Sequence, residues 1–296
     1  MVKEQDILFS SKEFKSILLN TFRFTVDFLN HHNLRWFVGG GTCIGTIRHK
    51  GLIPWDDDID LLMPREDYNK FLSLRTEMDG TGYELASWNT NNTTIPFAKV
   101  IDRNTTIWET KYHPFVSGVF IDIFPIDLSN RSFEEIIAEM KIYDRYLHKY
   151  ISAMGLFTIR DVFNLAIKRN YHFLKESIES FFTKYRKKYY LNKLQSLDKQ
   201  HNCKDGDYYV WFSACYVYSY EKEILNRRWF DDYILMPFEG IEVRVPIGYD
   251  AYLTHVYGNY MQLPPIEKRV TRHNHYYVNL KENKSLEEIL QIKKHE

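Results

Sequence analysis

The densest group of chemically active side chains is a run of four aspartates, Asp56, Asp57, Asp58 and Asp60, interrupted only by Ile59. On a strand, Asp58 and Asp60 would point to the same face, with Cα atoms roughly 6.5–7 Å apart. Two carboxylates on one face can hold one hard divalent cation or two adjacent ones. The run therefore predicts a metal site, and a solvated acidic turn is the alternative interpretation.

A further carboxylate, Asp122, interrupts the apolar run 119–124. An unpaired carboxylate is costly to bury, so it should be neutralised, paired with a cation or bound to a metal. We expect Asp122 to join Asp58 and Asp60 as a third acidic ligand. A simple ion pair with an arginine is the alternative.

A glycine-rich turn, 39–42, precedes the aspartates by about twenty residues. Glycines let backbone N–H groups approach a phosphate, and a helix N-terminus attracts anions. Two familiar glycine motifs are excluded, because the dinucleotide fingerprint would need glycine at Ile44 and the phosphate-binding loop would need lysine at Thr46. The turn therefore predicts a phosphate site of another kind.

The elements that must position these residues follow from periodicity and capping. Ser10 and Glu13 predict a capping box ahead of a helix over 11–31, and Pro64 predicts the first residue of another helix. Further helices are expected at 42–49, within 132–200, and after a second capping box formed by Ser285 and Glu288. Strands are expected at 35–38, 58–62, 83–88, 97–101, 119–124, 208–212 and 241–247. This order predicts an α+β fold.

Composition limits the function further. The 296 residues carry 39 basic and 39 acidic side chains, a balance that argues against a nucleic-acid binder. Cys43, Cys203 and Cys215 are too few and too far apart for a disulfide framework. No signal peptide and no apolar run of about 18 residues is evident, so a cytoplasmic protein is expected.

A Gly-Gly turn, an Asp-x-Asp pair and a later strand aspartate together resemble the nucleotidyltransferase (polymerase β-like) superfamily. More narrowly, 40–60 resembles the LicD family, which is distantly similar to the fukutin-type transferases. Further similar segments are 97–100, 120–127 and 257–265, followed by Arg269 and His273. The resemblance spans about 14–277 and departs at Asn259, where the family commonly has aspartate, and around 155–200, where no motif matches.

The resemblance implies an architecture and an activity. The fold would be a nucleotidyltransferase-like mixed sheet with flanking helices and a helical insertion: a catalytic core at 1–130, a helical segment at 131–205, and a part at 206–296 that completes the same domain. The activity would be transfer of phosphocholine from CDP-choline to a hydroxyl of a cell-surface glycan or teichoic acid precursor, with release of CMP. A nucleotidyltransferase, a transferase of ribitol or ethanolamine phosphate, and a non-catalytic nucleotide-binding module are the alternatives.

The resemblance also implies roles for individual residues. Asp58, Asp60 and Asp122 would hold one Mg²⁺ or two, with Mn²⁺ as an alternative, and Asp122 would steer the proton of the acceptor hydroxyl. The donor phosphates would contact Gly40, Gly41, Thr42, Arg48 and Lys99. The quaternary ammonium of choline needs aromatic faces, for which the candidates are Trp36, Trp55, Trp108, Tyr112, Trp211 and Tyr216.

A basic and aromatic segment, 168–193, stands apart from these motifs. It holds eight basic residues against Glu176 and Glu179, with Phe and Tyr interleaved. Such segments can lie on anionic membranes, which would suit a lipid-linked glycan acceptor and a peripheral position at the inner face of the membrane. A solvated helix face is the alternative interpretation.

Overall fold

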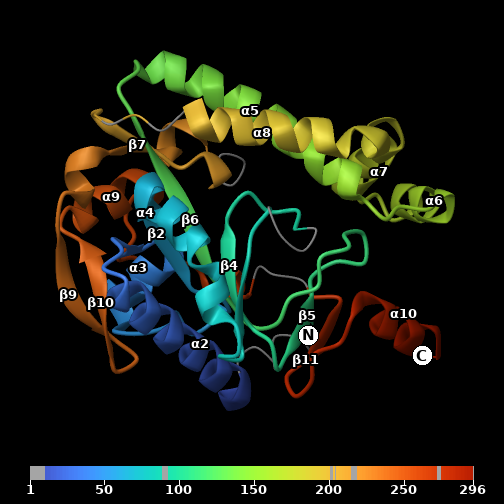
Figure 1. Cartoon of the computed structure of the whole chain (residues 1–296), viewed down its shortest axis with the longest axis horizontal. Helices are drawn as coiled ribbons and strands as arrows, with labels where there is room; N and C mark the ends of the chain where they lie inside the picture. The colour runs from blue at the N-terminus through green and yellow to red at the C-terminus, as the bar shows by residue number, and fades with distance from the viewer. Residues whose placement is uncertain are drawn as a thin grey trace.

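A mixed sheet with helices on its faces forms the centre of the molecule (Figure 1). This computed structural model describes residues 11–88, 93–200, 203, 205–214, 219–271 and 275–295. The seven-stranded sheet has the order β1-β2-β6-β4-β3, and β7 and β8 continue it from the far half of β6. Its strands are β1 (Phe37–Val38), β2 (Asp60–Pro64), β3 (Tyr83–Ala86), β4 (Ala98–Asp102), β6 (Phe120–Ser129), β7 (Tyr208–Val210) and β8 (Ile224–Asn226). The α+β fold predicted from the order of elements is confirmed.

The strand pairing determines which residues meet. β2 and β6 run parallel, whereas β6 pairs antiparallel with both β4 and β7. β6 is long and buried along almost its whole length, so β2 lies on one side of it and β4 on the other. Two two-stranded antiparallel sheets lie outside the main sheet: the hairpin of β9 (Tyr233–Phe238) with β10 (Ile241–Pro246), and the long-range pair of β5 (Thr106–Trp108) with β11 (Tyr277–Asn279).

Short helices cover the sheet and build the main core. α2 (Lys12–His31) turns Phe14, Leu18 and Phe22 inward toward β4 and β6. α3 (Gly40–His49) and α4 (Arg65–Ser73) pack on β2, and α9 (Tyr249–Tyr257) packs on α3. These surfaces close one continuous apolar core around the sheet.

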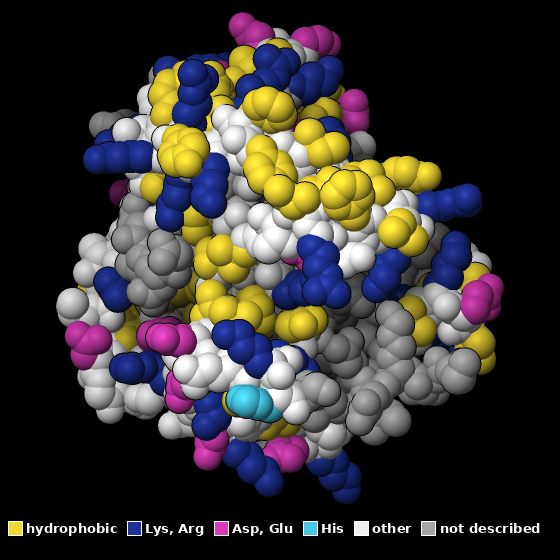
Figure 2. All heavy atoms as spheres, turned by 90° about the vertical axis from the view of Figure 1, so that its right-hand side faces the viewer, with side chains coloured by type: hydrophobic (Ala, Val, Ile, Leu, Met, Phe, Trp, Pro, Cys, Tyr) yellow, Lys and Arg dark blue, Asp and Glu magenta, His cyan; other side chains and the backbone are white. Residues whose placement is uncertain are grey.

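A second layer of helices lies across the top of the sheet in Figure 1. It comprises α5 (Phe133–Met154), α6 (Ile159–Ile167), α7 (Tyr171–Thr183) and α8 (Lys187–Gln200), and α10 (Leu286–His295) ends the described chain. α5 and α8 share a separate apolar core with Val210 and Ile224. Figure 2 shows the end of the molecule at which α6 and α7 project.

Within the described residues, no helix taken alone is long and apolar enough to cross a membrane. The pair α5 and α6, bent by 118° at the break between them, meets those criteria only when both helices are counted together.

Local boundaries differ from the sequence-based prediction in three places. The first described helix is capped by Ser11, whose hydroxyl accepts the N–H of Phe14, while the predicted cap Ser10 lies outside the described residues. Pro64 is the cap of α4 rather than its first residue. β2 begins at Asp60, so Asp58 lies in the loop before the strand and not on it. The short strands β5, β8, β9 and β11 were not predicted.

Candidate active site

A cavity of about 570 Å³ opens where the glycine turn, the start of β2 and the start of β6 meet. Four of its lining residues are acidic: Asp56, Asp58, Asp60 and Asp122. All three aspartates predicted as metal ligands thus face one cavity, although they come from a loop, β2 and β6. We call this space the acidic cavity.

Strand pairing brings two of these aspartates together. Asp60 and Asp122 occupy the same register position on the parallel strands β2 and β6, and the N–H of Asp122 donates to the carbonyl of Ile59 at 3.0 Å. Side chains in register on adjacent strands point to the same face, and the strands lie about 4.8 Å apart. The pairing therefore places both carboxylates on one wall.

The glycine turn fits closely against the acidic residues. Gly40 has a φ of +45°, and a Cβ there would lie 3.0 Å from Oδ2 of Asp60. A Cβ on Gly41 would lie 2.6 Å from Oδ2 of Asp56. The hydroxyl of Thr42 accepts the N–H of Asp60 at 2.8 Å, which ties α3 to β2. Glycine is required here because carboxylates approach the backbone from the cavity side.

The N-terminus of α3 is only partly available to a ligand. The N–H of Gly40 donates to the hydroxyl of Tyr252 at 3.0 Å. The N–H of Gly39 donates to the carbonyl of Asp60 at 2.9 Å. The predicted phosphate contacts of Gly40, Gly41 and Thr42 can therefore not include the N–H of Gly40 without loss of the Tyr252 bond.

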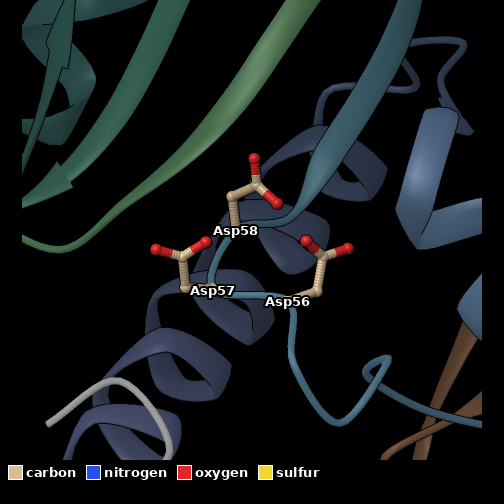
Figure 3. Close-up of side chains that lie close together, drawn as sticks. All are labelled: Asp56, Asp57 and Asp58. Atoms are coloured by element: carbon tan, nitrogen blue, oxygen red, sulfur yellow. The ribbon is translucent and has the colours of Figure 1, made fainter. Parts of the chain in front are cut away.

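Asp56, Asp57 and Asp58 form a compact acidic group in the loop that leads into β2 (Figure 3). One oxygen atom from each lies within 4.8 Å of the others, an arrangement that could hold a metal ion. Asp57 is buried, and its Oδ2 lies 3.4 Å from Nε2 of the buried His275. Asp57 is absent from the described cavity lining, so the carboxylates of Asp56 and Asp58 face the cavity without it.

The ammonium group of Lys99 forms an ion pair with the carboxylate of Asp122. Its Nζ lies 2.8 Å from Oδ1 of Asp122 and 3.1 Å from the ring centre of Phe120. Burial raises the pKa of Asp122 to about 6, while the charge of Lys99 acts in the opposite direction and that of Asp58 adds to the increase. Lys99 was predicted to clamp a donor phosphate. The structure instead directs its ammonium group at Asp122, and Lys99 is not among the described residues that line the cavity.

Two basic side chains also line the cavity. Arg48 and Lys268 both line it, and one terminal nitrogen of Arg48 donates to the carbonyl of Tyr260 at 2.7 Å. Burial lowers the pKa of Arg48, and the nearby charge of Arg269 lowers it further. Arg269 itself lies over the ring of Trp55 at 5.5 Å. Arg48, which was predicted to hold the donor phosphates, thus lines the cavity, and Lys268 is a second cation there that the sequence analysis did not single out.

Aromatic side chains line the cavity as well. Phe97 and Phe124 lie 4.2 Å apart by ring centres, and Phe124 meets Trp211 edge to face at 5.0 Å. Trp55, Tyr257 and Tyr260 also line the cavity. Of the six aromatic residues proposed for a choline cage, Trp55 and Trp211 line the cavity. Trp36 and Trp108 are buried elsewhere, Tyr112 stacks on Phe157, and Tyr216 lies outside the described residues.

The donor set fits a hard divalent cation. Mg²⁺ and Ca²⁺ bind carboxylate oxygens, and Mg²⁺ is usually held by one or two carboxylates together with substrate phosphates. Asp56, Asp58, Asp60 and Asp122 supply such oxygens, and Arg48 and Lys268, which line the same cavity, supply positive charge for phosphate. Asp56 was missed as a cavity residue because only the Asp-x-Asp spacing of 58 and 60 was used, although it stands in the same acidic run.

Comparison with known proteins agrees with this chemistry. Residues 33–153 match the family described as LicD/FKTN/FKRP, nucleotidyltransferase domain. The chain is 28% identical over 267 residues to the lipopolysaccharide cholinephosphotransferase LicD of Haemophilus influenzae, covering 88% of this chain and 95% of that protein. It is 38% identical over 58 residues to the human and mouse ribitol 5-phosphate transferase FKRP, covering 20% of this chain and 12% of that protein. Residues 33–153, which carry every acidic residue of the cavity, therefore belong to the LicD/FKTN/FKRP nucleotidyltransferase domain family.

Proposed function

We propose that this LicD-family transferase moves phosphocholine from CDP-choline to a hydroxyl of a cell-surface glycan or teichoic acid precursor and releases CMP. The observation that supports it best is that acidic, basic and aromatic side chains line one and the same cavity. A donor of this kind carries a diphosphate, which needs cations, and a quaternary ammonium, which needs aromatic faces. The name of the Haemophilus relative points to the same head group.

In the proposed reaction, the acceptor oxygen attacks the phosphorus that carries choline. A new P–O bond forms, the bond to the CMP phosphate breaks, and CMP leaves with that electron pair. Asp58, Asp60 and Asp122 would hold Mg²⁺ or Mn²⁺, and Asp56 stands beside them as a further oxygen donor. When bound, the cation would neutralise phosphate charge and polarise the reacting oxygens.

The protein residues would then orient the reactants. Arg48 would hold the donor phosphates, and Trp55 and Trp211 would contact the ammonium group. Lys99 would keep Asp122 in place through their 2.8 Å ion pair, leaving Asp122 on the cavity wall to steer the acceptor proton. Catalysis of phosphoryl transfer depends mostly on such positioning and on charge stabilisation.

Transfer of ribitol phosphate is a second candidate, favoured by the 58-residue match to FKRP. Both reactions would use the acidic and basic side chains of the cavity. The donors differ in the head group, because ribitol carries hydroxyls and no cation. Trp55, Trp211 and the other aromatic side chains of the cavity favour choline, although Ser213, Asn259 and Gln262 also line it and could bind hydroxyls.

The experiment is to incubate the protein with CDP-choline, CDP-ribitol or CDP-ethanolamine, Mg²⁺ and a lipid-linked or soluble glycan acceptor, and to identify the nucleotide released. We expect CMP from CDP-choline at the highest rate, no CMP after chelation with EDTA, and recovery on addition of Mg²⁺ or Mn²⁺. Faster turnover of CDP-ribitol would assign ribitol phosphate instead. Release of pyrophosphate from CTP would show a nucleotidyltransferase, and tight CDP-choline binding without turnover would show a binding module.

A further inference from the structure

The outer surface of α6 carries a row of exposed apolar side chains. Ile159, Phe163 and Ile167 are 69%, 67% and 80% exposed. They follow one another at a spacing of four residues, which places them along one side of a helix. Leu165 is the buried residue of α6, so the helix packs through the other side and leaves this row outward.

The apolar surface continues on α7 and the following turn, η2 (Lys184–Arg186). Phe182 is 80% exposed and Tyr185 is 96% exposed. α6 packs on α7, and α7 packs on η2. In Figure 2, hydrophobic side chains gather over the upper part of this end of the molecule, with lysines and arginines between them. Scattered apolar residues are normal on a protein surface, but a contiguous exposed group of this kind marks an interaction site.

Basic side chains surround this apolar group, and the acidic ones are turned away from it. Lys168, Arg169, Lys175, Lys184, Arg186 and Lys188 are all exposed. Only three residues between 159 and 193 are acidic. Asp161 pairs with Lys111 at 2.8 Å, Glu176 is buried against His113 at 2.6 Å, and Glu179 accepts a hydrogen bond from Ser152. The outward charge of this surface is therefore almost purely positive, in agreement with the excess of basic residues counted in 168–193.

A hollow of about 490 Å³ lies at the base of the same surface. Its wall combines apolar residues, among them Leu156 and Phe157, with Lys184 and Lys187. A space with apolar walls and two ammonium groups suits a phosphate attached to a hydrocarbon chain.

We propose that the surface formed by α6, α7 and η2 docks on a membrane rich in anionic phospholipid. Ile159, Phe163, Ile167 and Phe182 would enter the headgroup region, and the surrounding lysines and arginines would contact lipid phosphates. This is binding at the membrane surface and needs no spanning helix. A second copy of the chain fits poorly as the occupant, because two such basic surfaces would repel each other. The proposal does not depend on which head group the enzyme transfers.

The test is sedimentation of the full chain with vesicles of phosphatidylcholine alone or with about 30% phosphatidylglycerol. We expect at least about tenfold more binding to the anionic vesicles at low salt, and loss of that binding at high salt, because the Debye length falls from about 30 Å at 0.01 M to about 3 Å at 1 M. Two variants separate the contributions. Phe163→Ser/Ile167→Ser/Phe182→Ser removes apolar contacts, and Lys168→Glu/Lys184→Glu/Lys188→Glu reverses charge, so each should lose most of the binding.

Two matched controls lie far from this surface. Leu235→Ser removes one exposed apolar side chain from β9, and Lys12→Glu/Arg23→Glu reverses two exposed charges on α2. Both controls should bind anionic vesicles as the wild type does. Equal binding to both kinds of vesicle, no binding at low salt, or an equal loss in the controls would each overturn the proposal. A dimer in solution that the Phe163 variant converts to a monomer, without vesicle binding, would assign the surface to a second copy instead.

Discussion

Asp60 and Asp122, which are 62 positions apart in the sequence, occupy the same register position on the parallel strands β2 and β6. This pairing brings the Asp-x-Asp run and the isolated strand aspartate into one cavity. Because β6 is held by β4 on its other side, the position of Asp122 depends on the whole centre of the sheet. The candidate metal site therefore combines two strand residues, Asp60 and Asp122, with Asp56 and Asp58 from the loop that leads into β2.

The first prediction concerns the aspartates that line the acidic cavity. Asp58→Asn and Asp60→Asn each keep the shape of the side chain but remove a negative charge that the proposed cation needs. We expect the rate of CMP release from CDP-choline to fall by about 100-fold or more in each variant, with melting temperatures close to that of the wild type. Glu84→Gln, on β3 and outside the described cavity lining, is the matched control and should keep full activity. Unchanged rates in both aspartate variants would remove the metal assignment.

The second prediction concerns the Lys99–Asp122 pair. Lys99→Met leaves a buried carboxylate without its cation, which we expect to cost about 3 kcal/mol of unfolding free energy. The double variant Lys99→Met/Asp122→Asn removes both charges and should recover most of that loss. Denaturant unfolding of the two variants and the wild type measures the difference. If Lys99→Met is as stable as the wild type, Lys99 does not stabilise the protein by pairing with Asp122, and a contact with the donor phosphate becomes the better assignment for it.

The third prediction concerns the glycine turn. Gly40→Ala would place a methyl group 3.0 Å from Oδ2 of Asp60 in a backbone with a φ of +45°. Gly240 has a φ of +77° with open space around it, so Gly240→Ala isolates the backbone strain. Both variants should lose about 1 kcal/mol of stability, whereas only Gly40→Ala should lose at least about tenfold in rate, because Asp60 is displaced. Equal rates in the two variants would show that the approach of Gly40 to Asp60 has no catalytic importance.

The candidate site was largely readable from the sequence because its residue types are unusual where they occur. An aspartate in an apolar run, such as Asp122, or a run of acidic residues after a glycine turn lowers the stability of the fold unless a cation or a hydrogen-bond donor compensates the charge. Which cation balances which acid was not readable. Lys99 was assigned to phosphate because the register of β4 against β6, which sets Lys99 opposite Asp122, is a tertiary fact.

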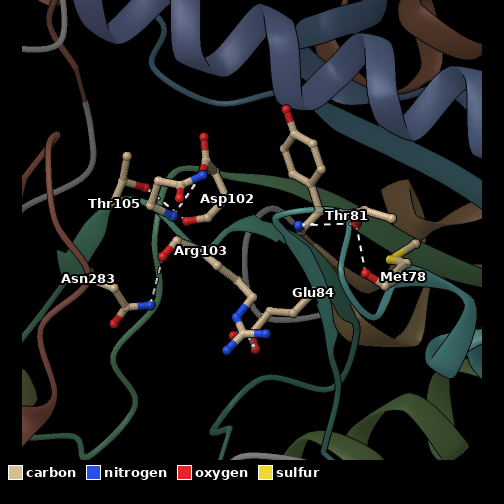
Figure 4. A network of polar contacts seen from close by, with 9 residues as sticks. Met78, Thr81, Glu84, Asp102, Arg103, Thr105 and Asn283 are labelled. Carbon is tan, nitrogen blue, oxygen red and sulfur yellow. Dashed lines mark hydrogen bonds and ion pairs between the residues drawn. The ribbon is translucent and has the colours of Figure 1, made fainter.

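The least predictable part of the fold is the way the C-terminal segment returns to the sheet. The amide of Asn283 donates to the carbonyl of Arg103 at 3.0 Å, in the turn that follows β4 (Figure 4). Nearby, the hydroxyl of Thr106 donates to the carbonyl of Glu282, and β11 pairs with β5. These strands have three residues each, which is too short for an alternating pattern to show in the sequence. The capping box of Ser285 and Glu288 was readable, because its residues are local to one another.

Glu223 is the most isolated carboxyl group in the described part of the chain. Its side chain is fully buried where η4 (Tyr220–Glu223) leads into β8, and neither carboxyl oxygen has a hydrogen-bond partner among the described residues. Burial raises its pKa from 4.5 to about 9, with a small opposing effect of Lys222. The native protein therefore holds Glu223 protonated at neutral pH, whereas the unfolded chain ionises it.

The fourth prediction follows from that difference. Between the unfolded pKa of 4.5 and the native pKa of about 9, the native state binds more protons than the unfolded state, so stability falls as pH rises. Glu223→Gln should abolish this contribution, so its free energy of unfolding at pH 8, measured with denaturant, should exceed that of the wild type by up to about 5 kcal/mol. The pKa values of Asp122 and Asp198 are raised only to about 6 and about 7, so these two groups stop contributing to the pH dependence of stability at a lower pH than Glu223 does. The difference in stability between wild type and Glu223→Gln should therefore keep growing toward pH 9, whereas Glu134→Gln, at an exposed position on α5, should show no such trend. A flat difference across this range would mean that Glu223 ionises near its ordinary pKa in the native protein.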